Sequence, residues 1–286
     1  MTSKTRKRSK KQIPGPGPSQ CHPRVGSRRP AHGCLPVSIL ERAAKKLGVV
    51  ETKSPLALRS SLERKLNVNS GQENSFVNAL PLTDNEKQYL KTTYLRPEQP
   101  LKWRDDPDMW LDSTNIENVM KQYEDAYPNF EFMGPFPIDF AAPDPYTKSK
   151  DQCLIKEICS LRVADSMKNG TQYIGIVYNL DPHFKDGSHW VANFIDIPKH
   201  RCYYFDSYGY EPPKQVARFM KWLTTQDPNM KLAYNARRFQ QKDSECGMYS
   251  LYFIIRMLMG DQFRPFCKRQ PPDSTMLDFR DWLFST

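Results

Sequence analysis

One stretch near the carboxyl end constrains the fold most strongly. Residues 246–259, CGMYSLYFIIRMLM, place apolar side chains on nearly every side when they are wound as an α-helix. Such a helix is stable in water only when other elements cover all of its faces. The chain must therefore contain a sheet or several helices that enclose this segment, which begins at Cys246.

The rest of the sequence supplies strands and helices to cover this segment. Runs rich in β-branched and aromatic residues predict strands at residues 173–180, 190–197, 202–206 and 232–239. Apolar residues at helical spacing predict helices at residues 39–48, 56–66, 83–90, 114–124, 152–167 and 213–225. Two capping boxes support these starts, Thr83 with Glu86 and Thr114 with Glu117. Because the strands follow one another among helices, the predicted fold class is α+β, with a central mixed sheet packed by helices.

The positive charge of the chain is concentrated at one end. The 42 Lys and Arg residues against 32 Asp and Glu give a formal net charge of +10, yet residues 1–40 hold nine basic residues and no acidic one. Six of the 24 prolines lie in residues 1–36, where no helical or strand period is visible. We therefore expect a disordered basic tail at residues 1–36, a helical arm-like region at 37–100 and the main domain at 101–286.

Two classes of protein are excluded by these patterns. The longest apolar stretch, at residues 251–260, is interrupted by Arg256 and is far shorter than the roughly 20 residues of a membrane-spanning helix. The basic amino terminus runs into a Pro-Gly repeat instead of an apolar segment, so no secretory signal is predicted. Seven irregularly spaced cysteines favour reduced intracellular thiols over a disulfide framework.

Four residues have the chemistry of a thiol nucleophile site. Cys246 begins the buried helix, where the positive end of the helix favours a thiolate and free N–H groups can stabilise an oxyanion. His189, at the start of a strand, can accept the thiol proton. Asp206 ends the next strand and can orient His189, while Gln240 can offer its amide to the oxyanion.

Each of these residues has a commoner explanation when taken alone. A Cys at the start of a buried helix is usually a small core residue, and a single His before a strand is usually at the surface. Asp206 precedes Ser-Tyr-Gly, which is typical of a turn, and Gln241 competes with Gln240 for the oxyanion role. Ideal hairpin counting about a turn at residues 198–201 also sets His189 several residues out of register from Asp206. Their contact therefore depends on curvature of the chain.

The joint order and spacing are more informative than any single residue. Over residues 103–262 the chain resembles the adenoviral-protease and SUMO-protease superfamily of cysteine peptidases, through His189-Trp190, Asp206, Gln240 and Cys246-Gly247. The element at residues 110–113, Trp-Leu-Asp-Ser, is similar to the Trp-Leu-Asn-Asp that opens the catalytic domain of SUMO proteases. One departure is Glu245, where many members have Asp.

This resemblance implies a fold, a mechanism and a set of roles. It implies the adenain/SUMO-protease-like fold and cysteine endopeptidase chemistry, with a Cys-His-Asp triad, a Gln oxyanion hole and no metal or organic cofactor. Trp110, Trp190 and Gly247 are the expected substrate-binding residues, since Gly247 lacks a side chain that would block a substrate. A buried core position is the plainer interpretation of Trp190, and both can hold together.

Within the superfamily the chain resembles the thiol proteases of nucleocytoplasmic large DNA viruses, relatives of the African swine fever virus polyprotein protease. The resemblance is carried by residues 110–124, 130–135 and 137–140 and by the helical N-terminal region. It implies cleavage of capsid or core precursors after a small residue such as Gly, in the host cytoplasm, nucleus or viral factory and in the virion. The alternatives are removal of SUMO or a related modifier, and an inactive DNA-binding virion core protein.

Two features of the N-terminal tail have their own interpretations. Its basic residues, within positions 4–29, are expected to contact DNA non-specifically, with a nuclear-import signal at residues 4–11 as an equal alternative. Cys21-His22 with His32 and Cys34 has the residue types of a zinc knuckle, but the proline-rich loops between them argue against a metal site. The remaining cysteines, Cys153, Cys159, Cys202 and Cys267, are expected to be core or surface thiols.

Overall fold

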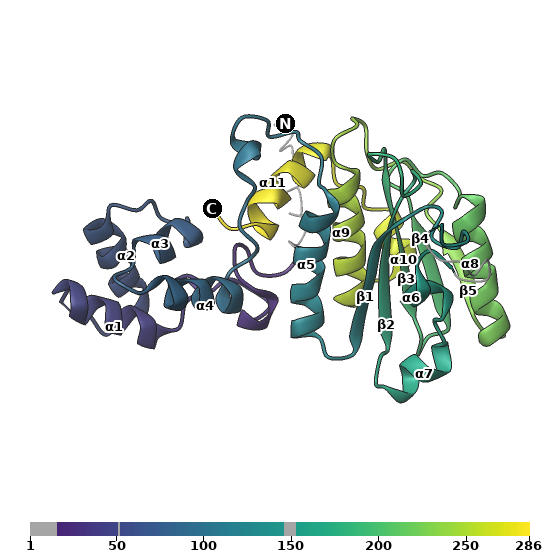
Figure 1. Ribbon diagram of the computed structural model, residues 1–286. Helices are drawn as coiled ribbons and strands as arrows, with labels where there is room; N and C mark the ends of the chain where they lie inside the picture. The colour runs from purple at the N-terminus through teal and green to yellow at the C-terminus, as the bar shows by residue number, and fades with distance from the viewer. Residues whose placement is uncertain (1–15, 51, 146–152) are drawn as a thin grey trace, which may run out of the picture.

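A five-stranded mixed sheet forms the centre of the larger part of the molecule (Figure 1). This computed structural model describes residues 16–50, 52–145 and 153–286. The strands lie in the order β1-β2-β3-β4-β5, the middle pairs being antiparallel and the two edge pairs parallel. They are β1 (Phe130–Pro137), β2 (Tyr173–Asn179), β3 (Trp190–Asp196), β4 (Arg201–Phe205) and β5 (Lys231–Tyr234). The prediction of an α+β fold with a mixed sheet is confirmed.

Helices cover both faces of this sheet. Helix α9 (Cys246–Leu258) packs on one face beside α5 (Ser113–Ala126), and α8 (Lys214–Gln226) covers the other (Figure 1). Side chains alternate along β3, so that Ala192 and Phe194 join the α9 side while Val191 and Ile195 join the α8 side. All 13 residues of α9 are buried, as its sequence predicts. Among the described residues, no helix has the length and apolar character needed to cross a membrane.

Several predicted elements are wrong or absent in detail. The single helix expected at residues 152–167 is two short helices, α6 (Lys156–Cys159) and α7 (Val163–Lys168). The chain breaks between them because Leu161 is buried beside α8 and the Gln226 side chain accepts a hydrogen bond from the Val163 N–H. The strand expected at 232–239 ends at Tyr234, since the next residue, Asn235, turns to bind the end of β4.

Other elements were not predicted. Strand β1 lies in a proline-rich passage for which no strand is predicted, and its prolines are tolerated because β1 is an edge strand. Helix α5 is capped by Asp112 with Asn115 as its reciprocal partner, so the predicted Thr114–Glu117 box is wrong. No helix is predicted at three further positions, which the structure shows to be α3 (Glu73–Ala79), α10 (Phe263–Cys267) and α11 (Asp273–Leu283).

Four helices form a separate arm beside the sheet domain (Figure 1). They are α1 (Val37–Leu47), α2 (Pro55–Leu66), α3 and α4 (Asp84–Tyr94). Helix α4 starts with the predicted capping box, in which Thr83 and Glu86 each accept from the other's backbone N–H. The arm has its own hydrophobic core, which includes Leu40, Leu62 and Phe76. The helical N-terminal region is therefore present as expected.

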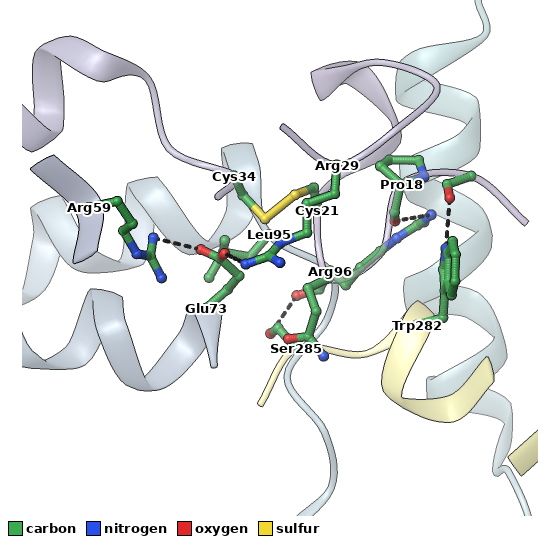
Figure 2. The surroundings of a disulfide bond; sticks show 12 residues. Pro18, Cys21, Arg29, Cys34, Arg59, Glu73, Leu95, Arg96, Trp282 and Ser285 are labelled. Carbon is green, nitrogen blue, oxygen red and sulfur yellow. Dashed lines mark hydrogen bonds and ion pairs between the residues drawn. A yellow bond between two sulfur atoms is a disulfide. The ribbon is translucent and has the colours of Figure 1, made fainter. Parts of the chain in front are cut away.

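Residues 16–36, here called the N-terminal segment, have defined contacts in the structure, so the expectation of disorder is wrong for these residues. Cys21 and Cys34 form a disulfide and are 0% and 3% exposed (Figure 2). Both belong to the hydrophobic core of the arm, together with Leu35. The local sequence lacks helical or strand periodicity because this segment is held by long-range contacts. Residues 1–15 lie outside the described residues.

The N-terminal segment also joins the arm to the sheet domain. The Trp282 indole N–H of α11 donates to the Gly17 carbonyl at 2.7 Å, and the Gln20 N–H donates to the Trp282 carbonyl at 2.9 Å (Figure 2). On the other side, the Arg96 N–H donates to the Gln20 carbonyl, and Cys21 pairs with Leu95 just after α4. The segment is therefore bonded simultaneously to the end of the arm and to α11.

The expectation that the cysteines are reduced thiols is wrong for four of the seven. Cys21 is bonded to Cys34, and Cys153 to Cys159, because folding brings each pair together; their spacing alone gave no such indication. Cys202, Cys246 and Cys267 are free. The bonded pair Cys21 and Cys34 also accounts for the two sulfur atoms considered as zinc ligands.

The Cys21–Cys34 bond closes a loop with a sequence separation of 13 residues. For the double substitution Cys21→Ser with Cys34→Ser we expect a loss of about 3 kcal/mol in the free energy of unfolding, because the unfolded chain regains the entropy of that loop. Urea unfolding measures this loss. Substitution of the free, half-buried Cys267 by Ser is the control, and equal stability of the double variant and this control would contradict the expectation.

Candidate active site

The Cys246 thiol lies at the amino-terminal end of α9, where the helix meets the sheet. Cys246 is the first residue of this helix and is 1% exposed. Its position is set by the burial of the whole helix, and especially by the packing of α9 against β3. The first backbone N–H groups of a helix have no intrahelical partner, so this end offers hydrogen-bond donors and partial positive charge beside the sulfur.

His189 and Asp206 are in direct contact across the β3–β4 hairpin. The His189 Nε2 lies 2.8 Å from the Asp206 Oδ1. The observed ladder pairs Ala192 with Phe205, and its continuation sets Val191 opposite Asp206, two residues from His189. The offset is thus smaller than the hairpin count predicts, and the bend of the chain before β3 closes the remaining distance. The expected contact between His189 and Asp206 is present.

The protonation of His189 is set by these neighbours. Burial alone lowers the pKa of the imidazole, but its hydrogen bonds to Asp206 and Cys246 and the negative charges of both groups raise the pKa to about 9. Because Nε2 faces Asp206, Nδ1 is the ring nitrogen left for the thiol. The arrangement therefore favours a protonated His189 imidazole at neutral pH.

The Asp206 carboxylate is held by backbone and side-chain contacts on the carboxyl side of β4. The carboxylate is 2% exposed, and its Oδ1 also accepts the Tyr208 N–H at 2.8 Å. The Asn235 side chain binds both backbone groups of Asp206, accepting its N–H at 2.9 Å and donating to its carbonyl at 2.6 Å. Asn235 is completely buried. Asn235 therefore fixes the backbone of Asp206, and rotation of the carboxylate away from His189 would also break its bond from the Tyr208 N–H.

Gln240 is the better placed of the two candidate glutamines. It is 0% exposed, and its Oε1 accepts the Ser207 hydroxyl at 2.7 Å. This bond fixes which end of the amide is the donor, and the buried Nε2 has no hydrogen-bond partner among the described residues. Gln241 is exposed instead, and its backbone N–H donates to Asp273. A buried, oriented and unpaired N–H donor is what an oxyanion hole requires.

A groove of about 560 Å³ has Trp190, the neighbour of His189, in its wall, although none of the four candidate reactive residues lines it. Trp110 also lines this groove and is 44% exposed. Trp190 is also a core residue, since it is 8% exposed and its indole N–H donates to the Leu111 carbonyl at 2.9 Å. Trp190 is therefore a core residue that also lines the groove, and its contact with a substrate stays a prediction.

The expected role of Gly247 is not supported by the structure. A Cβ at this position would lie 3.0 Å from the Leu111 Cβ and 3.3 Å from the Trp190 Cδ1. The space beside Gly247 is filled by these two side chains and is not open to a substrate. Glycine is required here because α9 approaches the segment before α5 so closely.

A buried ion pair fixes the residue before Cys246. The Glu245 carboxylate is 1% exposed and accepts two hydrogen bonds from Arg280 of α11, at 2.7 and 3.1 Å. The Arg280 guanidinium also lies 4.7 Å from the centre of the Trp103 ring. Glu245, the departure from the superfamily pattern, thus reaches across to α11 instead of capping α9.

Three residues that support the predicted ones are not predicted from the sequence: Ser207, Tyr208 and Asn235. The available signal was position: Ser207 and Tyr208 follow Asp206 where β4 ends, and Asn235 is the first residue beyond β5. Polar residues at the ends of neighbouring strands meet at one edge of the sheet. In the part of the chain that the structure describes, no group of three or more His, Cys, Asp or Glu side chains is arranged to hold a metal ion.

Sequence comparison finds protease relatives for the part of the chain that holds these residues. Residues 171–281 match the Ulp1 protease family, C-terminal catalytic domain. A protein of Acanthamoeba polyphaga mimivirus, named as a thiol protease, is 38% identical over 161 residues, which is 54% of this chain and 49% of that protein. This chain thus spans about half the length of that relative. A cysteine protease of African swine fever virus is 29% identical over 185 residues, covering 61% of this chain and 67% of the viral protein.

A solved structure extends the likeness to the arm. The crystal structure of the African swine fever virus protease covers 94% of this chain and 96% of its own, with a TM-score of 0.61 and 22% sequence identity. The fold is therefore shared with that viral protein over nearly the whole length. Residues 171–281 are thus similar to the catalytic domain of the Ulp1 protease family.

Proposed function

We propose that this chain is a cysteine endopeptidase in which Cys246, His189, Asp206 and Gln240 carry the reaction. The observation that carries the proposal is the 2.8 Å contact of the buried Asp206 carboxylate with His189, whose pKa is raised in part by the helix-terminal Cys246 thiol. Acid, base and nucleophile in one connected row are the requirement for thiol proteolysis.

The chemical steps follow from the positions of these groups. The Cys246 thiolate attacks the scissile carbonyl, and the Gln240 Nε2 with the Cys246 N–H stabilises the oxyanion that forms. His189 then gives its proton to the leaving amine, which releases the first product and leaves an acyl-enzyme. Water, deprotonated by His189, hydrolyses that thioester. Asp206 holds the imidazole in position during both steps.

For substrates we propose viral structural precursor proteins, cut after a small residue such as Gly during virion maturation. The support is similarity to proteases of two large DNA viruses and a groove whose walls include two tryptophans. On this proposal the enzyme acts in the infected cell and is packaged in the virion. Removal of SUMO or a related modifier is the second candidate, because similar proteins of several African swine fever virus isolates are named SUMO-1 cysteine proteases.

The further alternative, an inactive DNA-binding core protein, is less well supported. Two of the basic residues assigned to DNA contact are engaged within the fold: Arg24 pairs with Asp125 at 3.2 Å, and Arg29 pairs with the fully buried Glu73. The basic residues at 4–11 lie outside the described residues. DNA contact by these residues remains part of the proposal, as an addition to proteolysis.

Substitution of Cys246 by Ser or Ala should abolish proteolysis, because no other group can form the thioester. The measurement is cleavage of a fluorogenic Gly-containing peptide by the purified variants, alongside labelling by a thiol-reactive probe. Cys267→Ser is the matched control, since Cys267 is also free and is partly exposed. Cleavage by Cys246→Ala at more than about 1% of the unsubstituted rate would contradict the proposal.

The pH profile should report the His189 pKa. With a pKa of about 9, the imidazolium persists at neutral pH, so kcat/KM should fall as the pH rises through about 9. In Asp206→Asn the carboxylate that raises this pKa is lost; the alkaline limb should move to lower pH and kcat should fall about 10²- to 10⁴-fold. The control is Asp227→Asn, which breaks a second His–Asp pair, with His200, at the other end of β3. An unmoved alkaline limb in Asp206→Asn would rule out the assigned role.

The two substrate classes are distinguished by parallel digestions whose cleavage rates are compared. The enzyme is incubated with virion precursor proteins and, separately, with conjugates of a modifier that ends in Gly-Gly, and the new termini are identified by mass spectrometry. We expect cuts after small residues in the precursors at a rate at least about tenfold higher than in the conjugates. Faster cutting of the conjugates would favour the modifier-removing function instead.

A further inference from the structure

A tyrosine beside the catalytic imidazole has no role in the reaction described above. The rings of His189 and Tyr208 are stacked, with 4.9 Å between their centroids and 21° between their planes. Tyr208 is in turn contacted by a cation, since the Arg238 Cζ lies 4.9 Å from the centre of the Tyr208 ring. One side of His189 is therefore covered by Tyr208, and Tyr208 is held by Arg238.

Arg238 has a second set of contacts, with the backbone that carries the oxyanion amide. Its Nε donates to the Gln240 carbonyl at 2.6 Å, and its Nη2 donates to the Gln241 carbonyl at 3.4 Å. Because Gln240 is completely buried and its Nε2 is unpaired, a small backbone shift would move that donor away from the oxyanion. The guanidinium thus holds the main chain on which the donor is mounted.

Tyr208 also contacts both Asp206 and the loop that follows Gln240. Its backbone N–H donates to the Asp206 Oδ1 at 2.8 Å, and its hydroxyl donates to the Lys242 carbonyl at 3.1 Å. One end of the residue is therefore bonded to the carboxylate that orients His189. The other end is bonded to the loop between Gln240 and Cys246.

We propose that Tyr208 and Arg238 form a positioning pair, which sets the imidazole plane of His189 and the amide of Gln240 relative to each other. The inference rests on the proposed function. Tyr208 acts through His189 and Asp206, while Arg238 acts through the backbone that carries Gln240. The coupling matters because the proton acceptor and the oxyanion donor must be aligned at the same moment, and misplacement by about 1 Å can cost up to about 10²-fold in rate.

The test compares two reactions of the same thiol. Alkylation of Cys246 by iodoacetamide needs the thiolate and the imidazolium but forms no tetrahedral oxyanion, whereas peptide cleavage needs both. In Arg238→Ala we expect kcat for a fluorogenic peptide to fall at least about tenfold, with KM changed less than about threefold. The alkylation rate should stay within about twofold of the unsubstituted enzyme.

Substitutions of Tyr208 should give a different pattern. Tyr208→Ala removes the ring that lies on His189, so kcat and the alkylation rate should fall together. Tyr208→Phe keeps the ring and should retain the alkylation rate. Arg238→Lys keeps the positive charge and one donor, and should recover part of the kcat lost in Arg238→Ala.

Arg237→Ala is the matched control, because Arg237 is the exposed neighbour of Arg238 and no hydrogen bond joins its side chain to Gln240. Circular dichroism and thermal unfolding report whether each variant is folded. If Arg238→Ala is unfolded, Arg238→Lys decides the matter, since a kcat equal to that of Arg237→Ala would overturn the proposal. So would a parallel loss of kcat and alkylation in a folded Arg238→Ala. Failure of the unsubstituted enzyme to cleave any peptide would instead reject the proposed function.

Discussion

The complete burial of α9 is the constraint on which the rest of the structure depends. An apolar helix beginning at Cys246 must be covered by the sheet, by α5 and by α11, and each cover also delimits the site. Gly247 lets Leu111 and Trp190 come against the helix, while Glu245 is tied to α11 through Arg280. A rigid first turn follows, which keeps the backbone N–H groups and the sulfur in a fixed relation.

A network of polar side chains lies where β3 begins and where β4 and β5 end. Asp206 is out of solvent, so its charge requires several partners, which are His189, Tyr208 and the backbone contacts of Asn235. Ser207 extends the network to Gln240. The same low-polarity surroundings strengthen the interaction of the carboxylate with the imidazole, and the hydrogen bonds and charges together outweigh the cost of burying the imidazolium.

Part of the basic charge near the N-terminus has a structural role, because it lies in the N-terminal segment. A tail that looks purely electrostatic in the sequence supplies a disulfide to the arm core and hydrogen bonds to α11. Arg29 neutralises Glu73, which is fully buried and is also paired with Arg59 at 3.1 Å (Figure 2). Such a charge would be costly to bury without these cations. The segment that joins the arm to the sheet domain thus also carries part of the positive surplus.

The fold class, most helices, four of the five strands and the four candidate residues of the triad and oxyanion hole can be predicted from the linear chain. These are recoverable because hydrophobic period, capping residues and the order of His189, Asp206, Gln240 and Cys246 are properties of the linear chain. Tertiary structure alone decided the pairing of cysteines, the edge strand β1, the filled space at Gly247 and the supports Tyr208, Asn235 and Arg238. Contacts between residues far apart in the chain leave no local period, so no pattern in the sequence announces them.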